Sequence, residues 1–197
     1  MPSLLSSVAI VVLGLGFFPS FSAASNSSDL ATKTTVFLSA PSFAVVGASD
    51  DETKFGTIVR RLLCLRYCLA YLGLQVFKTM LEQGLNAVPI NPFVSESQGI
   101  TCLDTLASLP DPAHTSISIV TQPAVTLQIL QQASALGILA AWLQPGAQDE
   151  AVLEFINSTT DGTTYIYSSA ISTDTLGPCL FDNPAMPDLI STLGVLG

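Results

Sequence analysis

Phe43-Ala-Val-Val-Gly47 is followed by the polar turn Ala-Ser-Asp-Asp-Glu-Thr and then by Lys54-Phe-Gly56. The apolar run that ends in glycine predicts a short buried strand. The turn after it leads toward a helix and carries small residues where a bound group would approach. Such a turn presents backbone N–H groups and a helix N-terminus to an anion. The alternative is an ordinary strand-to-helix turn in which glycine serves the geometry alone.

The rest of the chain repeats this alternation of strand and helix. Further strands are predicted at 86–90, 116–120, 138–143 and 163–167, and helical segments at 103–109, 122–136 and 148–156. Strands that alternate with helices of about a dozen residues indicate a parallel sheet. The predicted fold is therefore α/β: a doubly wound sheet of about five parallel strands, with helices on both faces, in a single domain. Ligands of such sheets bind beyond the carboxyl ends of the strands, where the winding direction reverses.

The charges are few and unevenly placed. Only 11% of the 197 residues are charged, 49% are hydrophobic, and the formal net charge is -9. All six Lys and Arg residues lie between 33 and 78. This composition excludes a disordered acidic protein and argues against nucleic acid as a partner, because phosphate contacts need clustered cations. It leaves room for one phosphate-bearing ligand held by backbone N–H groups.

No catalytic or metal-binding residue is predicted. His114 is the only histidine and the chain has four cysteines, so a Cys/His zinc site is not indicated. Ser49 has no candidate base near it in the sequence, and Cys179 lies far along the chain from His114. We expect His114 to be a solvated loop residue.

The first 33 residues are predicted to lie outside the domain. Residues 1–24 contain the apolar run Val8–Phe18 and resemble a secretory signal, although no Lys or Arg precedes Lys33. An apolar N-terminal extension is the alternative. Residues 25–33 are interpreted as a linker. Secretion would follow if residues 1–24 are cleaved.

Six short motifs, taken together and in order, resemble one known family. They are Phe43-Ala-Val-Val-Gly-Ala-Ser49, Lys54-Phe-Gly56, Val88-Pro-Ile-Asn-Pro92, Thr121-Gln-Pro123, Trp142-Leu-Gln-Pro-Gly146 and Gly177-Pro-Cys179. Their order resembles that of the CoA-binding domain family, small Rossmann-type proteins similar to the N-terminal domain of the succinyl-CoA synthetase α subunit. The resemblance covers about residues 34–181, which leaves 182–197 as a C-terminal tail, and it implies a cytoplasmic protein.

The resemblance implies CoA or acyl-CoA as the ligand and a place for each of its parts. The implied residues are Gly47, Ala48, Ser49, Lys54, Phe55 and Gly56 for the phosphates, Asn91 and Pro92 for the adenine and ribose end, Thr121, Gln122 and Pro123 for the pantetheine, and Gln144, Pro145 and Gly146 for the thiol end. The synthetase carries its phosphorylated histidine in a second domain, and His114 does not match it. The resemblance therefore implies binding without catalysis.

Two other functions stay open. An NAD(P)-binding oxidoreductase would need Gly-x-Gly-x-x-Gly and an acid after the second strand, whereas Ala48 and Ser49 follow Gly47, and Asn91 follows the strand. A secreted or membrane-associated interaction protein would use the same core as a scaffold. Its functional parts would be residues 1–24 and 60–75, the only places where we expect membrane contact or self-association.

Residues 60–75, called segment 60–75 below, interrupt the resemblance. In the family, the first helix runs without interruption from a Lys-Phe-Gly turn into a sequence like Val76-Phe-Lys-Thr-Met-Leu81. Here the two halves are Lys54-Phe-Gly-Thr-Ile-Val59 and Val76–Leu81, and sixteen residues lie between them. They hold three of the six basic residues and two of the four cysteines. One hypothesis is an insertion, such as a retained intron. The other is a helix lengthened by about four turns, with Gly73 as its one weak point.

Overall fold

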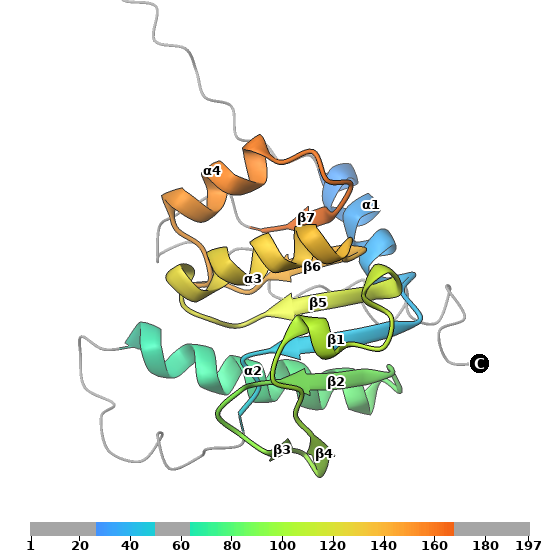
Figure 1. Ribbon diagram of the computed structural model, residues 1–197, viewed down its shortest axis with the longest axis vertical. Coiled ribbons are helices and arrows are strands. Elements are labelled where there is room, and N and C mark those ends of the chain that lie inside the picture. The colour runs from blue at the N-terminus through green and yellow to red at the C-terminus, as the bar shows by residue number, and fades with distance from the viewer. Residues whose placement is uncertain (1–26, 50–63, 168–197) are drawn as a thin grey trace, which may run out of the picture.

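The computed structural model describes residues 27–49 and 64–167, which form three layers with a central sheet (Figure 1). In chain order the elements are α1 (Ser27–Leu38), β1 (Ser42–Val46), α2 (Cys64–Glu82), β2 (Ala87–Ile90), β3 (Glu96–Ser97), β4 (Ile100–Thr101), the 3₁₀ turns η2 (Leu106–Ser108) and η3 (Pro112–His114), β5 (Thr115–Ile119), α3 (Pro123–Leu136), β6 (Ala140–Leu143), α4 (Glu150–Ser158) and β7 (Thr164–Ile166). The predicted leader 1–24, Gly177-Pro-Cys179 and the tail 182–197 lie outside the described residues.

The large sheet has five parallel strands in the order β2-β1-β5-β6-β7. The chain passes from β1 to β2 on one side and then crosses to β5, β6 and β7 on the other. At its last residue, Val46, strand β1 is paired with Ile90 of β2 and Ile119 of β5. The reversal of winding therefore lies between β1 and β5. The predicted doubly wound α/β sheet of five parallel strands is confirmed.

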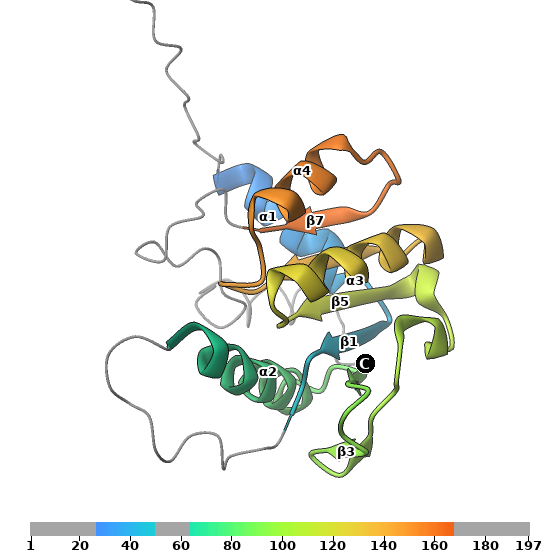
Figure 2. The ribbon, with the colours of Figure 1, turned by 60° about the vertical axis from the view of Figure 1, so that its left-hand side comes forward.

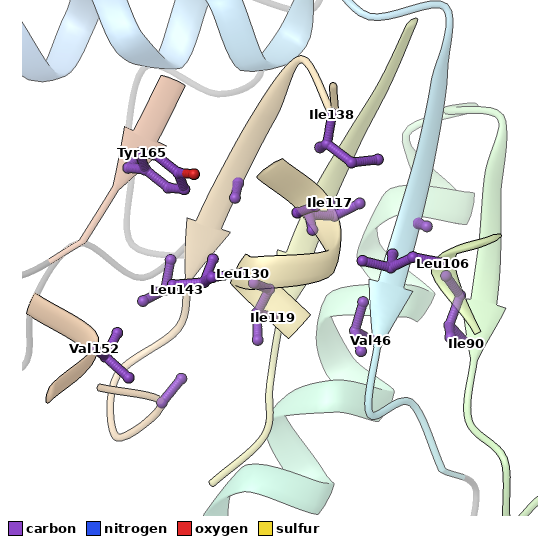
Figure 3. Packing of buried hydrophobic residues seen from close by; sticks show 14 of the residues in the cluster. Val46, Ile90, Leu106, Ile117, Ile119, Leu130, Ile138, Leu143, Val152 and Tyr165 are labelled. Atoms are coloured by element: carbon purple, nitrogen blue, oxygen red, sulfur yellow. The ribbon is translucent and has the colours of Figure 1, made fainter. Parts of the chain in front are cut away.

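Helices cover both faces of the sheet. One core cluster lies between the sheet and helices α1 and α2; its members include Phe37, Leu38, Phe43, Val45, Val76, Phe77, Met80, Trp142 and Ile166. The other lies on the α3 and α4 face, as Figure 3 shows, and includes Val46, Ile90, Leu106, Ile117, Ile119, Leu130, Ile138, Leu143, Val152 and Tyr165. Every residue of β5 and β6 is buried, which is characteristic of central strands in a parallel sheet.

The linker predicted for residues 25–33 is wrong from Ser27 onward, because Ser27–Leu38 forms helix α1. The sequence is rich in Ser and Thr, which are weak helix formers, so local propensity gives little sign of it. Packing supplies the stability instead. The Phe37 ring lies 5.7 Å from that of Phe43 and 5.3 Å from that of Trp142, the latter edge to face. Helix α1 packs against β7 and β6, and Figure 2 shows it beside β7.

Segment 60–75 is helical over the part that the structure describes. Residues 64–75 belong to the same unbroken helix, α2, as Val76–Leu81. The lengthened-helix interpretation is therefore confirmed for these residues, while residues 60–63 lie outside the described part and the origin of the segment stays a prediction. None of the helices in the described ranges is long and apolar enough to cross a membrane.

Strands β3 and β4 form a small antiparallel hairpin that the sequence patterns did not reveal. Glu96 pairs with Thr101 and Ser97 with Ile100. The two residues between the strands, Gln98 and Gly99, have φ values of 52° and 74°, as a tight two-residue hairpin turn requires. The hairpin lies between β2 and η2, so the connection from β2 to β5 is folded and not an open loop.

Candidate functional site

The loops that follow β1, β2, β5 and β6 all leave the same edge of the sheet, because the four strands are parallel. They contain Gly47–Ser49, Asn91–Pro92, Thr121–Pro123 and Gln144–Gly146. These are all the predicted site residues within the described part, so the fold brings them to one edge. Lys54, Phe55 and Gly56 lie outside it. Parallel α/β sheets bind ligands at this edge, at the reversal between β1 and β5.

Gly47 occupies the reversal point itself. Its N–H donates to the Ile90 carbonyl at 2.9 Å, and the Val120 N–H donates to the Val46 carbonyl at 2.9 Å. Gly47 has a φ of 95°, and a Cβ placed there would lie 2.6 Å from the Val120 carbonyl oxygen. Both the backbone conformation and the contact exclude a side chain. The fold itself therefore requires glycine at this position, and the binding of a ligand at the turn stays a prediction.

Asn91 fastens this turn to the loop after β2. Its side-chain Nδ2 donates to the Ala48 carbonyl at 2.7 Å, and its Oδ1 accepts from the Phe93 N–H at 3.0 Å. Ala48 is fully buried beneath the turn, whereas Pro92 and Phe93 are exposed. An amide side chain is suited to this position because it both donates and accepts. Asn91 therefore holds two of the predicted ligand-binding loops in register.

The loop after β5 leads directly into helix α3. The Thr121 and Thr126 hydroxyls are 2.8 Å apart, and the Thr126 hydroxyl also donates to the Thr121 carbonyl at 3.2 Å. Pro123 is the first residue of the helix, and its N-cap, Gln122, has no side-chain capping bond. The N-terminus of α3 thus stands at the carboxyl edge without a side-chain cap, beside the Gly47 turn.

The loop after β6 contains a buried amide. The side chain of Gln144 is fully buried, and its Nε2 donates to the Ser118 hydroxyl at 3.1 Å. Gly146 has a φ of 90°, and the Ala147 N–H closes the turn on the Gln144 carbonyl at 3.0 Å. Pro145 and Gly146 are half-buried at the edge. The structure therefore gives Gln144 an internal role in joining β5 and β6, and its predicted contact with a thiol end stays a prediction.

Helix α2 does not present its N-terminus to the Gly47 turn, as the sequence led us to expect of the helix after β1. The residue of α2 that meets the turn is Gly73, nine residues after the first described residue of the helix, Cys64. At 1.5 Å per residue the helix start is at least about 14 Å away along the axis. Residues 64–72 form the described part of α2 that precedes this contact. Sequence reasoning treated Gly73 as a weak point and missed this contact.

His114 lies at the opposite edge, directly before β5. It is exposed, and its Nδ1 is 2.8 Å from a carboxylate oxygen of Asp111. The prediction of a solvated histidine is confirmed. Within residues 27–49 and 64–167 no three His, Cys, Asp or Glu side chains are grouped as metal ligands. An open hollow of about 460 Å³ lies elsewhere, between α1, the end of α4 and β7, and is lined by Lys33, Asn157 and Tyr167 among others.

The fold and the carboxyl-edge loops define an α/β domain of the class that binds nucleotide-like ligands at the reversal of a doubly wound sheet. The CoA binding domain family matches residues 70–172, just over half of the chain. The chain belongs to the CoA-binding domain family, and this membership supports CoA-related binding. The match begins within α2, so Gly47 precedes it. No curated protein matches the chain.

Two of the similar solved structures, those with TM-scores above 0.5, support the fold. A hypothetical protein from Pyrococcus horikoshii OT3 is 18% identical, with a TM-score of 0.56 over 85% of this chain and 92% of its own. A protein redesigned for binding is also 18% identical, with a TM-score of 0.55 over 83% of this chain and 91% of its own. A conserved hypothetical protein from Pyrococcus furiosus is 28% identical, covers 68% of this chain and 98% of its own, and has a TM-score of 0.49.

Proposed function

We propose that the chain binds CoA or an acyl-CoA at the carboxyl edge of its sheet and does not catalyse a reaction on it. The observation that carries this proposal is Gly47, whose φ of 95° and contact with Val120 leave the turn after β1 without a side chain at the reversal of a CoA-binding domain. Backbone N–H groups that follow Gly47 in such a turn would donate hydrogen bonds to phosphate oxygens, so a chain of net charge -9 has a means to hold an anion.

The ligand would extend across the loops in the order of its own parts. Its phosphates would lie at Gly47–Ser49 together with Lys54–Gly56, and its adenine and ribose at Asn91 and Pro92. The pantetheine would follow Thr121–Pro123, beside the uncapped start of α3. The thiol end would lie at Pro145 and Gly146, above the buried Gln144 side chain. This path crosses the reversal point between β1 and β5, the usual ligand position in such sheets.

The side chains of the described carboxyl-edge loops support ligand binding without catalysis. The loops at 47–49, 91–94, 121–123 and 144–149 carry no His, Lys, Arg or Cys. His114 is at the other edge, and Cys102 is buried. A nucleophile or a general base with a pKa near neutrality is therefore not among the side chains that these loops bring together.

A thermal-shift comparison of CoA, acetyl-CoA and NAD tests the proposal. A ligand that binds only the folded chain raises its stability by RT ln(1 + [L]/Kd), about 2.7 kcal/mol at a hundredfold excess over Kd. For a chain of this size that corresponds to a rise in Tm of roughly 5 to 10 °C. We expect CoA or acetyl-CoA to give a saturable rise that NAD does not match. A larger shift with NAD would overturn the proposal in favour of a dinucleotide site.

A further inference from the structure

Helix α2 and the turn after β1 meet at two glycines. A Cβ placed on Gly73 would lie 2.8 Å from the Gly47 carbonyl oxygen and 3.4 Å from the Ala48 Cα. Gly73 is buried in the middle of the helix, where a glycine costs about 1 kcal/mol relative to alanine. The contact with backbone atoms explains why a glycine is nevertheless suited to this position. Gly73 allows the helix to lie directly on the Gly47 turn.

The register of α2 on the sheet is set by residues that follow Gly73. Val76, Phe77 and Met80 are buried in the cluster that also contains Phe43 and Val45 of β1. Gly73 precedes Phe77 by four residues and Met80 by seven, so all three lie on one face of the helix. Any residue that takes the place of Gly73 must therefore stand four positions before Phe77.

The sequence holds a second glycine with matching spacing. Gly56 stands three residues before Val59, as Gly73 stands three residues before Val76. Joining Gly56 directly to Leu74, by removing residues 57–73, would place Gly56 four positions before Phe77. Only eight residues would then separate Gly47 from Gly56, so the helix would have to begin close to the turn.

We propose that Gly73 occupies the position against Gly47 that the sequence spacing of Gly56 would also fit. We further propose that residues 64–72 of α2, which precede Gly73, place the start of the helix away from the ligand site and so weaken anion binding there. The fold is kept because one glycine substitutes for the other against Gly47. The site loses the positive end of a helix dipole, which stabilises a nearby anion by about 0.3–2 kcal/mol within its first turn only. The second part of this inference rests on the proposed CoA function.

The substitution of one glycine for the other is tested first in the full chain. We expect Gly73→Ala to lower the Tm by roughly 3 to 10 °C, the usual range for overpacking against atoms that cannot move aside. Gly56→Ala is the matched control and should leave the Tm within about 2 °C. The sign is diagnostic, since alanine in place of a helical glycine otherwise stabilises. An unchanged or raised Tm for Gly73→Ala would overturn the inference.

The deletion of residues 57–73 tests the effect on the site. We expect the shortened chain to fold, and Gly56→Ala in that chain now to lower the Tm. Calorimetric titration with CoA should give a Kd roughly 2- to 30-fold lower than that of the full chain. A shortened chain that does not fold, or that binds CoA no tighter, contradicts the inference. If neither chain binds CoA, the proposed function fails, and the two alanine substitutions still decide whether Gly73 replaces Gly56.

Discussion

Gly47 is constrained both by its backbone conformation and by a close contact with a neighbouring strand end. Its φ of 95° lies in the region that L-residues rarely adopt, and its missing side chain leaves room for the Val120 carbonyl. Gly162 has a similar φ of 86° but nothing within 4 Å of where a Cβ would lie. Alanine substitutions at Gly47 and Gly162 therefore distinguish the cost of backbone strain from the cost of the close contact.

We expect Gly47→Ala to destabilise the fold more than Gly162→Ala and to abolish CoA binding. Strain alone costs about 1–2 kcal/mol, and the 2.6 Å contact adds to it only at Gly47. Urea unfolding gives the free energies of unfolding, and a thermal shift with CoA reports binding. Equal losses of stability and intact binding in both variants would show that the turn tolerates a side chain.

Phe93 is the most exposed large hydrophobic residue of the described chain, with 93% of its surface accessible. It directly follows Pro92, where the adenine end is proposed to lie. Stacking of a base on an aromatic ring contributes about 1–3 kcal/mol.

We therefore expect Phe93→Ala to weaken CoA binding roughly fivefold or more and to leave phosphopantetheine, which has no adenine, unaffected. Val125→Ala, at another exposed apolar residue, serves as the control. Calorimetry with both ligands measures the difference. Equal losses for the two ligands would place the base elsewhere.

At the scale of single residues the sequence predicted Gly47 well, because strand, glycine and polar turn are local signals. It also pointed to Asn91, but not to the bond from its side chain to Ala48, which joins residues 43 positions apart. Gly73 was misjudged for the same reason. Glycine is suited to position 73 because the helix contacts Gly47 there, and helix propensity takes no account of such a contact.

At the scale of elements, the five strands of the large sheet were predictable to within one or two residues because they are short apolar or alternating runs bounded by turn residues. Helix α1 was not. Five of its twelve residues are Ser or Thr, and the side of the helix that is buried can be recognised only once the sheet it covers is known. Phe37, Phe43 and Trp142 form one aromatic group that joins α1, β1 and β6.

We expect Phe37→Ala to lower the free energy of unfolding by about 3–5 kcal/mol, since the side chain is fully buried and its loss leaves a cavity. Val36→Ala, one position away and only partly buried, should cost much less. Urea unfolding of both variants measures the effect. A small loss for Phe37→Ala would mean that α1 is dispensable to the core.

The connection from α4 to β7 contains a pair that responds to pH. The Tyr165 hydroxyl donates to Asp161 at 2.7 Å. Partial burial opposes ionisation of Asp161, but hydrogen bonds from Ser134, Tyr165 and the Thr163 N–H lower its pKa below the usual 3.8. Burial, together with the bond to Asp161, raises the pKa of Tyr165 above 10.

The lowered pKa of Asp161 means that its contribution to stability is present above about pH 4 and is lost as the pH falls further. The raised pKa of Tyr165 means that its contribution is complete below pH 10 and is lost above it. We expect Tyr165→Phe to cost about 1–2 kcal/mol at pH 7. The difference from the parent chain should shrink at pH 2–3, as urea unfolding would show, and a difference independent of pH would contradict this assignment.

At the scale of the whole molecule, charge and fold agree on what the chain can bind. Three of its six cations lie in segment 60–75, so the rest of the chain offers an anion little beyond backbone N–H groups and helix ends. The sheet gathers four loops from distant parts of the sequence at one edge. The edge was predictable from the alternation of strands and helices, whereas the contact of α2 with the Gly47 turn depends on the tertiary packing of Gly73.

Direct calorimetric titration of the full chain with CoA tests the central claim. Gly47→Ala, checked for folding by circular dichroism, is titrated beside it. We predict saturable binding at one site per chain with a Kd below about 1 mM, equivalent to a binding free energy of at least about 4 kcal/mol, and no binding by the variant. No saturable heat from CoA or acetyl-CoA, or equal binding by the variant, would contradict a CoA site at the Gly47 turn.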